Sequence, residues 1–405
     1  MDIAAIRSQF PILNRRLYGR QMVYLDNTAT SQTPQRVVDA IVGGYTRTKA
    51  NVHRGVHTLS QEATELQESA RQRVKEYINA EAAEEIIFTR GTTEALNLVA
   101  SSFGGMILGR DDELILTVME HHANIVPWQL LQAQRGFKIK VVPIDSAGNL
   151  DIEAYKRLFT PHTRLVSVCH ASNVLGTVNP VGEMIAYAHS AGVPVVVDGA
   201  QAAPHLPIDI RALDADFYTF SAHKMYGPTG VGVLYGKRRH LEQMPPYQGG
   251  GEMIDSVSFE GTTFASLPYK FEAGTPDFIG IAALSKAIDF IEETGLEQIA
   301  AHEEELLSHT TSRMLAEIPG IRIFGSAPGK CAIISFLLAG AHHYDTGMLL
   351  DKLGIEVRTG HHCAQPLMNA LGVEGVVRAS FAAYNTLQEA DLFVDALARV
   401  AKILG

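Results

Sequence analysis

Short apolar runs alternate with helical patterns over roughly residues 80–240, and this alternation limits the folds that the chain can adopt. The runs have the composition of buried strands and lie at residues 84–89, 113–118, 138–144, 164–170, 194–198, 216–221 and 230–236. Apolar residues recur at helical spacing in the intervening segments 92–103, 123–136 and 180–192. Apolar strands separated by amphipathic helices predict an α/β fold, with a mostly parallel central sheet covered on both faces. Such sheets bind ligands at the carboxyl ends of their strands.

The pattern changes after this region. Residues 246–276 are rich in Gly, Ser and Thr and have no helical period, and a loop of this length is usually functional. A long helical pattern follows at 295–318, and a strand–helix–strand pattern continues to the end of the chain. We therefore predict a large domain over residues 20–294. A smaller α+β domain is expected from residues 1–19 plus 295–405.

The composition narrows the functions that the chain can have. Its net charge of −10 argues against nucleic-acid or anionic-membrane binding, because both require basic surfaces. The longest apolar stretch, residues 331–341, is too short to span a bilayer and is expected to form a buried strand. The N-terminus lacks the pattern of a signal peptide and predicts a short helix. Cys169, Cys331 and Cys363 are odd in number and far apart, which indicates a cytoplasmic protein without a disulfide framework.

Two strand ends carry groups suited to a charged ligand. Gly91, Thr92 and Thr93 lie between a predicted strand and a predicted helix, where free N–H groups and two hydroxyls can hold an anion. Taken alone, this stretch is better interpreted as an ordinary threonine N-cap. Asp198 ends an apolar strand and could form a salt bridge with a protonated ring nitrogen of a cofactor. A structural cap is an equally good interpretation of Asp198 alone.

A third strand end adds a lysine. Ser221, His223 and Lys224 follow the strand at 216–221. Most lysines at strand ends face solvent, but in a desolvated pocket beside other cations the amine loses its proton more easily and can form a Schiff base. Ser221 and His223 could contact a phosphate. An anion site, a strand-end aspartate and a strand-end lysine together describe a site for pyridoxal 5′-phosphate (PLP).

Eight motifs in a fixed order resemble one enzyme family: TRGTTE, EHHAN, SNVLGT, DGAQ, SAHKMYGPTG, EAGTP, RTGHHC and RASFAAYNT. The chain resembles the class-V, fold-type-I PLP-dependent enzymes, and more narrowly the SUF-type (type II, CsdB-like) cysteine desulfurases. The similarity runs from YLDNTAT at 24–30 to the final helix. The motif SAHKMYG departs slightly from the expected SGHKLYG. This resemblance implies a large PLP-binding domain and a small domain that carries an active-site cysteine.

The resemblance also implies a set of cofactor contacts. Lys224 would bind PLP covalently, Asp198 would pair with its ring nitrogen, and His121 would stack on the ring and take part in proton transfer. The remaining contacts would come from Asn173, Gln201, Thr92, Thr93, Ser221, His223 and, across a homodimer interface, Thr275.

On the substrate side, the resemblance implies that Arg378 binds the carboxylate of L-cysteine and that Cys363 accepts its sulfur. The other substrate-binding residues would be Asn27, Ala29, His53, Arg54 and Arg358. L-Alanine would leave, and a persulfide on Cys363 would serve iron–sulfur cluster assembly or other sulfur delivery through a small SUF-type acceptor protein. Nearby cations would favour the thiolate, and Arg358, His361 and His362 are the candidates.

The same residues allow other functions. EHH and HHC offer four histidines and a thiolate, but adjacent residues seldom point at one ion, so no metal is expected. Cys169 and Cys331 lie at the ends of buried-looking strands and are expected to have no chemical role. A selenocysteine lyase acting on L-selenocysteine, or another class-V PLP lyase or aminotransferase, is the alternative activity. A sulfur-delivery scaffold and a cofactor-free α/β binding protein are the alternatives outside catalysis.

Overall fold

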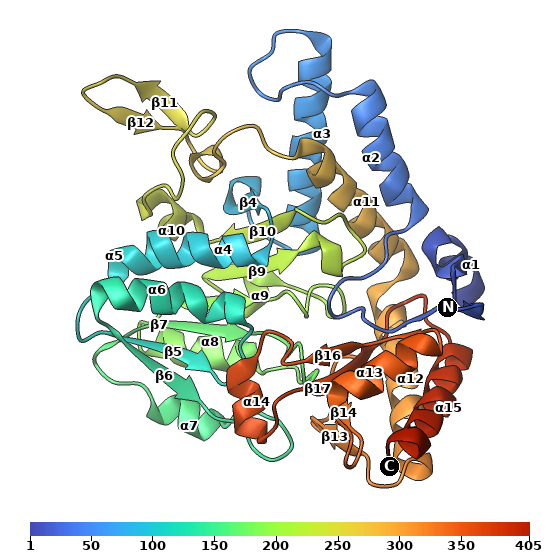
Figure 1. Cartoon of the computed structure of the whole chain (residues 1–405). Coiled ribbons are helices and arrows are strands. Elements are labelled where there is room, and N and C mark those ends of the chain that lie inside the picture. Colours follow the sequence, from blue (N-terminus) through green and yellow to red (C-terminus); the bar gives the residue numbers. More distant parts are fainter.

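A seven-stranded sheet forms the centre of the molecule (Figure 1). The computed structural model describes all 405 residues. In order across the sheet, the strands are β4 (Ile86–Thr89), β10 (Gly232–Gly236), β9 (Phe217–Ser221), β8 (Val195–Asp198), β7 (Thr163–Cys169), β5 (Glu113–Thr117) and β6 (Lys138–Val142). β10 alone runs in the direction opposite to the other strands of this sheet. The predicted mostly parallel central sheet is therefore confirmed.

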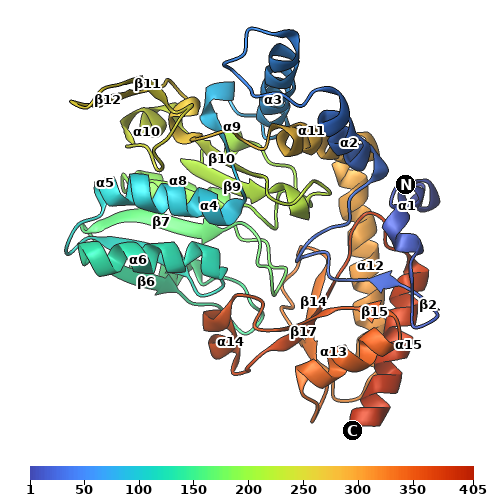
Figure 2. The ribbon, with the colours of Figure 1, turned by 45° about the horizontal axis from the view of Figure 1, so that its top comes forward.

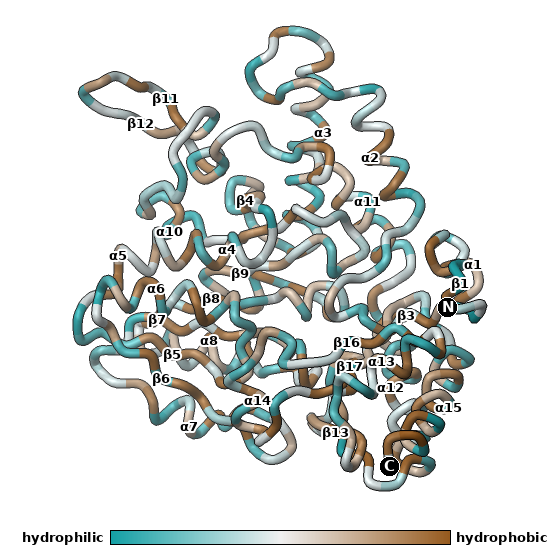
Figure 3. The backbone as a smooth tube through the Cα atoms, viewed as in Figure 1, coloured by the Kyte–Doolittle hydropathy of each residue, from teal (hydrophilic) through white to brown (hydrophobic).

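Alternate residues of the strands pack against helices on opposite faces of this sheet. Leu114 and Leu116 of β5 belong to an apolar cluster with Trp128, whereas Ile115 between them belongs to the larger cluster on the other face. The first cluster includes residues of α4 (Thr92–Leu98) and α6 (Val126–Arg135), and the second includes residues of α3 (Thr58–Tyr77), α8 (Val181–Ser190) and α11 (Phe278–Thr294). Burial on both faces explains the continuous apolar strands, which stand out in Figure 3.

Further helices surround these layers: α2 (Gln35–Arg47), α5 (Gly105–Ile107), α7 (Ile152–Arg157), α9 (Ile210–Leu213) and α10 (Arg238–Gln243). The expected N-terminal helix is present as α1 (Ile3–Ser8), and a short ladder of β1 (Arg16–Leu17) and β2 (Arg20–Gln21) follows it. No helix in the chain combines the length and the apolar character that crossing a membrane requires.

A second, antiparallel sheet is formed by the C-terminal part of the chain. Its strands, in order, are β13 (Arg322–Phe324), β14 (Ile333–Leu337), β17 (Val376–Ser380) and β16 (Arg358–Gly360). The buried strand β14 confirms the strand expected within residues 331–341. The surrounding helices are α12 (Leu296–Glu317), α13 (His343–Lys352) and α15 (Leu387–Leu404) (Figure 2). The structure thus combines a large α/β part around the central sheet with a smaller α+β part around the second sheet, which is the predicted fold class.

The helices α11 and α12 meet at Gly295, where the predicted division of the chain falls. The φ of Gly295 is 87°, a left-handed value that favours glycine. Near the N-terminus, β3 (Val23–Tyr24) pairs in parallel with β15 (Ile355–Glu356), so this early segment packs beside the second sheet. The division into residues 20–294 and 1–19 plus 295–405 stays a prediction.

The loop at 246–276 contains a short hairpin that the sequence pattern did not predict. Strand β11 (Ile254–Val257) pairs with β12 (Thr262–Phe264), and the hairpin projects from the body of the molecule (Figures 1 and 2). Apart from Ile254, its residues are exposed, and Phe259 at its tip is fully exposed. Neither face of the hairpin is buried. Its sequence therefore lacks the alternation of apolar and polar residues from which half-buried strands are predicted.

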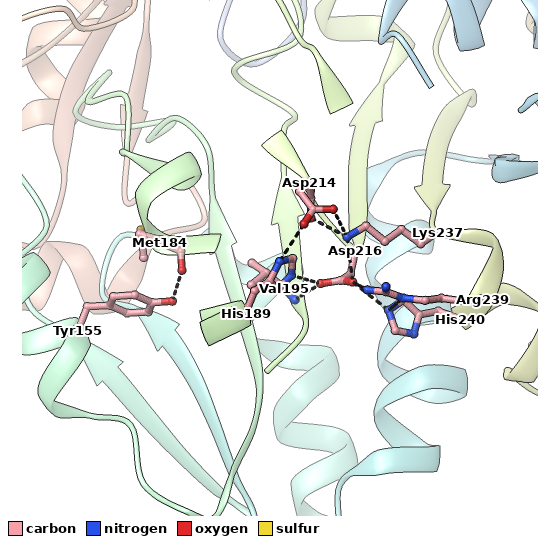
Figure 4. Close-up of polar contacts among 9 residues, drawn as sticks. All are labelled: Tyr155, Met184, His189, Val195, Asp214, Asp216, Lys237, Arg239 and His240. Carbon is pink, nitrogen blue, oxygen red and sulfur yellow. Dashed lines mark hydrogen bonds and ion pairs between the residues drawn. The ribbon is translucent and has the colours of Figure 1, made fainter. Parts of the chain in front are cut away.

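A network of charges lies at the edge of the central sheet opposite the carboxyl ends of its parallel strands (Figure 4). The buried Asp216 accepts hydrogen bonds at Oδ2 from His189 Nε2 (2.7 Å) and Val195 N (2.9 Å). Its Oδ1 accepts from Arg239 Nη2 (2.9 Å) and His240 Nε2 (2.9 Å). Burial raises the pKa of Asp216, but these hydrogen bonds outweigh burial and hold the pKa well below its usual range.

We therefore expect Asp216→Asn to lower the free energy of unfolding by about 3 kcal/mol at neutral pH. The pKa of Asp216 is lower in the folded than in the unfolded state, so its stabilisation is complete above about pH 4 and is lost as the pH falls further. Urea unfolding at several pH values measures both effects. Asp255→Asn, on the exposed hairpin, is the matched control, and equal losses in the two variants would contradict a special role for Asp216.

Candidate active site

A pocket opens at the carboxyl ends of the central strands, where the loop after β16 and strand β17 meet them. The carboxyl ends of the parallel strands form one wall of the pocket, which is where such sheets are expected to bind ligands. Most of the residues that the sequence selected line this pocket: Ala29, Thr92, Thr93, His121, Asn173, Asp198, Gln201, Ser221, His223, Lys224, Arg358, Cys363 and Arg378. Segments far apart in the sequence thus converge on one site.

Hydrogen-bond donors gather at one end of the pocket, where α4 begins. Thr92 N donates to Ser221 Oγ (2.8 Å), and the hydroxyl oxygens of these two residues lie 2.9 Å apart. Strand β10 passes very close to this turn, since a Cβ added to Gly232 would lie 2.3 Å from Gly91 Cα. Glycine at both positions lets the backbone of the turn sit against the sheet. Hydroxyls and the N-terminal amides of a helix are the donors that a phosphate group requires.

An acid and an amine both line the pocket. Asp198 is buried at the end of β8, accepts a hydrogen bond from Ala200 N (2.9 Å) and forms no ion pair. Burial raises its pKa, while the Ala200 N–H and the charge of Lys224 act in the opposite direction. Burial lowers the pKa of Lys224 to about 8, although the charge of Asp198 partly opposes this. A larger fraction of the Lys224 amine is therefore neutral near physiological pH than of an ordinary lysine, although the protonated form still predominates.

His121 lies in the turn between β5 and α6 and lines the same pocket. Its Nδ1 accepts a hydrogen bond from Ala123 N (3.1 Å), so the neutral ring carries its proton on Nε2. Burial, followed by the charge of Lys224, lowers the pKa of His121 to about 3. His121 is thus a neutral N–H donor at physiological pH.

Two arginines share one carboxylate at the other end of the pocket. Arg378 is buried on β17, and its Nη1 donates to Asn173 O (2.9 Å) while its Nη2 donates to Asp26 Oδ1 (3.2 Å). Arg358 Nη1 lies 3.7 Å from Asp26 Oδ2. The buried Nε of Arg378 has no hydrogen-bond partner. Two cations beside one anion, with one donor free, suit the carboxylate of a substrate.

Cys363 reaches the pocket from a turn between β16 and α14 (Gln365–Leu371). Its thiol is free and half-buried. Both His362 and Cys363 have left-handed backbones, with φ of 51° and 56°. Asn173 Nδ2 donates to His362 O (2.8 Å), and the ring of His362 is buried with its Nε2 3.2 Å from Val376 O. His362 therefore packs inside the turn.

Four of the selected residues do not line this pocket: Asn27, His53, Arg54 and Thr275. Asn27 is buried behind the pocket, where its Nδ2 donates to Ser380 O (2.6 Å). This hydrogen bond joins the segment before α2 to strand β17, and the predicted substrate contact of Asn27 stays a prediction.

The other three lie on a separate face. His53 Nε2 is 3.6 Å from Glu68 Oε1, and Arg54 Nε is 3.0 Å from Glu252 Oε1. Thr275 lines a different cavity, near the start of α11. The structure of one chain does not bring these residues to Lys224, and their predicted roles stay predictions.

Sequence reasoning did not place Thr28 or Cys169 in the pocket, and it named His362 only as a candidate cation beside the thiol. Thr28 Oγ1 is buried without a hydrogen-bond partner, and only its position inside the YLDNTAT motif could have marked it. Cys169 ends β7 as a second thiol in the pocket. Burial raises its pKa well above the usual value, which makes Cys169 a poor nucleophile.

The chemistry of these residues fits PLP. Thr28, Arg378 and His362 line the pocket, and each has a buried polar atom without a hydrogen-bond partner: Oγ1, Nε and Nδ1, respectively. Unpaired polar atoms beside a pocket suit a polar ligand. A buried carboxylate that forms no ion pair suits a protonated ring nitrogen, and an amine whose pKa is lowered to about 8 suits reaction with an aldehyde. The donors around Thr92 suit a phosphate.

Comparison with known proteins gives the class directly. The model of the class-V aminotransferase family matches residues 23–393, and the chain belongs to that family. A cysteine desulfurase of Cronobacter sakazakii is 50% identical over 405 residues, which cover 100% of this chain and 99% of that protein.

Solved structures agree with this relationship. The cysteine desulfurase CsdA from Escherichia coli has a TM-score of 0.93 at 41% identity, over 100% of both chains. A mutant of C-DES with glycine covalently linked to its PLP cofactor has a TM-score of 0.82 at 25% identity, over 98% of this chain and 99% of the other. The fold and the family that the eight motifs implied are both confirmed.

Proposed function

We propose that the chain is a PLP-dependent cysteine desulfurase, which converts L-cysteine to L-alanine and keeps the sulfur as a persulfide on Cys363. One observation carries this proposal: Cys363, on a turn beside the second sheet, lines the same pocket as Lys224 and Asp198 of the central sheet. Transfer of an amino group requires the lysine and the acid but has no use for a thiol. Transfer of sulfur requires all three.

Different residues of the pocket would hold different parts of the cofactor. Asp198 would keep the ring nitrogen protonated, Lys224 would bind PLP covalently, and Thr92 and Ser221 would hold its phosphate. Bound PLP supplies an electron sink for bonds broken at the substrate Cα.

The chain's own groups bind L-cysteine and move its protons. The free Nε of Arg378, together with Arg358, would hold the carboxylate. The Lys224 amine, with a pKa of about 8, is able to remove the proton from Cα near neutral pH. His121 presents its Nε2–H to the pocket and orients the reacting groups as a hydrogen-bond donor.

The thiolate of Cys363 would then attack the sulfur of the substrate. A sulfur–sulfur bond forms and the carbon–sulfur bond breaks. The electron pair of the broken bond stays on carbon, which takes up a proton and leaves as alanine. Carbon is reduced while the transferred sulfur is oxidised, so the step requires no external oxidant or reductant.

The direct test is to incubate the PLP-loaded enzyme with L-cysteine, quantify alanine and locate the persulfide by mass spectrometry after alkylation. Alanine formation together with a persulfide on Cys363 supports the proposal. Alanine formation without sulfur on Cys363 would remove the acceptor role. The same assay with L-selenocysteine tests the alternative lyase activity.

We propose a homodimer in which each chain completes the other's site. Thr275, His53 and Arg54 lie outside the pocket of their own chain. Thr275 Oγ1 contacts Asn51 Oδ1 (3.2 Å), so the loops that carry these residues form one continuous face. A second copy that places this face at its pocket would bring Thr275 to the phosphate of PLP.

Thr275→Ala is expected to weaken PLP retention about tenfold, because one hydrogen bond to a charged phosphate is lost. Dialysis followed by absorbance measures the retained cofactor, and Thr262→Ala on the exposed hairpin is the matched control. A catalytically normal monomer in analytical ultracentrifugation would contradict the shared site.

We also propose that the sulfur leaves on a small acceptor protein of the SUF type. The half-buried Cys363 lies on a short, well-anchored turn, which limits how far the persulfide can travel. An acceptor thiol that comes to the mouth of the pocket suits this geometry, and iron–sulfur cluster assembly suits such a transfer.

A further inference from the structure

His122, next to the predicted catalytic histidine, bonds to the cysteine turn at two points. Its backbone N–H donates to Cys363 O (2.7 Å). Its ring Nε2 accepts a hydrogen bond from Gln365 N (3.2 Å). His122 follows β5 of the central sheet, whereas Cys363 and Gln365 belong to the turn and helix beside the second sheet. One residue that follows a strand of the central sheet thus bonds to both sides of the turn.

The turn needs such support because its backbone is unfavourable. His362 and Cys363 are successive non-glycine residues with left-handed φ values, and each such conformation costs about 1 kcal/mol or more. His361 Nδ1 accepts from Cys363 N (3.1 Å), which supports the turn only from within. The contacts from His122 anchor it to the pocket wall.

Gln365 is the first residue of α14, and its N–H has no partner within the helix. The ring of His122 supplies that partner. Because Nε2 accepts, the neutral ring carries its proton on Nδ1. The centroid of the exposed His361 ring lies 5.5 Å from that of the His122 ring. Burial and the neighbouring His361 lower the pKa of His122, which favours the accepting, neutral form.

We propose that His122 is a positioning residue, which holds the Cys363 thiol toward the pocket for attack on the substrate sulfur by bonding to Cys363 O and to Gln365 N. This inference rests on the proposed desulfurase activity. It assigns His122 to the sulfur-transfer step alone, since its ring makes no hydrogen bond to the groups that bind the cofactor or the carboxylate.

The test uses PLP-loaded His122→Phe, which keeps an aromatic ring but removes the acceptor. In single-turnover reactions with L-cysteine, persulfide formation on Cys363 is expected to slow about tenfold. PLP absorbance, L-cysteine binding and exchange of the Cα proton with solvent deuterium should stay at wild-type levels.

His122→Gln, whose side-chain oxygen can accept from Gln365 N, is expected to restore most of the rate. His162→Phe, an exposed histidine without a side-chain hydrogen bond, is the matched control.

Gln365→Pro removes the same hydrogen bond from its other end. Proline is tolerated at the first position of a helix, where it lacks only the N–H that His122 binds. It is expected to slow persulfide formation as His122→Phe does, and the double variant should be no slower than either single variant. This variant also provides the test where His122→Phe does not fold.

The outcomes separate this inference from the function on which it rests. A wild-type enzyme that forms no persulfide on Cys363 would overturn the desulfurase proposal itself. A wild-type persulfide with an unchanged rate in His122→Phe and Gln365→Pro would overturn the positioning role only. A parallel loss of Cα proton exchange would also overturn it, because it would show a general structural defect.

Discussion

Lys224→Ala is expected to abolish covalent attachment of PLP and to lower the rate of alanine formation by about 10⁴-fold or more. Two roles are lost together, since the amine both anchors the cofactor and removes the proton from Cα. The pocket makes this amine reactive: burial lowers its pKa to about 8, and the charge of Asp198 limits this lowering. A solvent-exposed lysine would stay protonated and unreactive.

The pH dependence of cofactor attachment follows from the same pKa. Only the neutral amine attacks an aldehyde, so the rate at which the apoprotein binds PLP covalently should rise with pH through about 8 and level off above it. Stopped-flow absorbance after mixing apoprotein with PLP measures this rate. The dependence is absent in Lys224→Ala.

Lys330 is a stringent control for this prediction. Burial lowers its pKa to about 8 as well, but its Nζ donates to Gly325 O (2.7 Å) and it does not line the pocket. Lys330→Ala should therefore retain the borohydride-sensitive absorbance of bound PLP. If Lys224→Ala kept that absorbance while Lys330→Ala lost it, the cofactor lysine would be misassigned. A low pKa alone does not define the site, whereas position at the end of a strand does.

The sequence could predict those site residues that lie at the ends of strands. Parallel strands end at the same edge of the sheet, so Asp198 after β8 and Lys224 after β9 had to lie near each other once the strands were recognised. The apolar runs were recognisable because both faces of the sheet are buried. Thr92 followed in the same way, since α4 begins directly after β4.

Contacts between the two sheets could not be predicted in this way. Asp26 lies between Arg358 and Arg378, and His122 holds Gln365, but no periodic pattern links residues so far apart in the chain. These contacts depend on how the second sheet packs against the first, which is a property of many side chains at once. The exposed hairpin of β11 and β12 was missed for the opposite reason, because it packs against nothing that would impose a pattern.

The thiol is the group that separates sulfur transfer from other class-V chemistry, and Cys363→Ser isolates it. This variant is expected to bind PLP and L-cysteine normally, because Cys363 forms no part of the phosphate, ring-nitrogen or carboxylate contacts proposed above. Exchange of the Cα proton should continue, since Lys224 is intact. Persulfide formation should be absent and alanine formation should fall at least about 10³-fold, because a hydroxyl is far less ionised than a thiol and does not accept sulfur.

Cys169→Ser is the matched control for that loss, since Cys169 is a second thiol lining the same pocket. Burial holds the pKa of Cys169 well above its usual value, and its Sγ lies against Met119 O (4.0 Å) behind the strand ends. We expect Cys169→Ser to form alanine and the Cys363 persulfide at near wild-type rates. Persulfide on Cys169 in the Cys363→Ser variant, with alanine formation preserved, would move the acceptor role to Cys169. The half-buried Cys363 turn would then serve only to close the pocket.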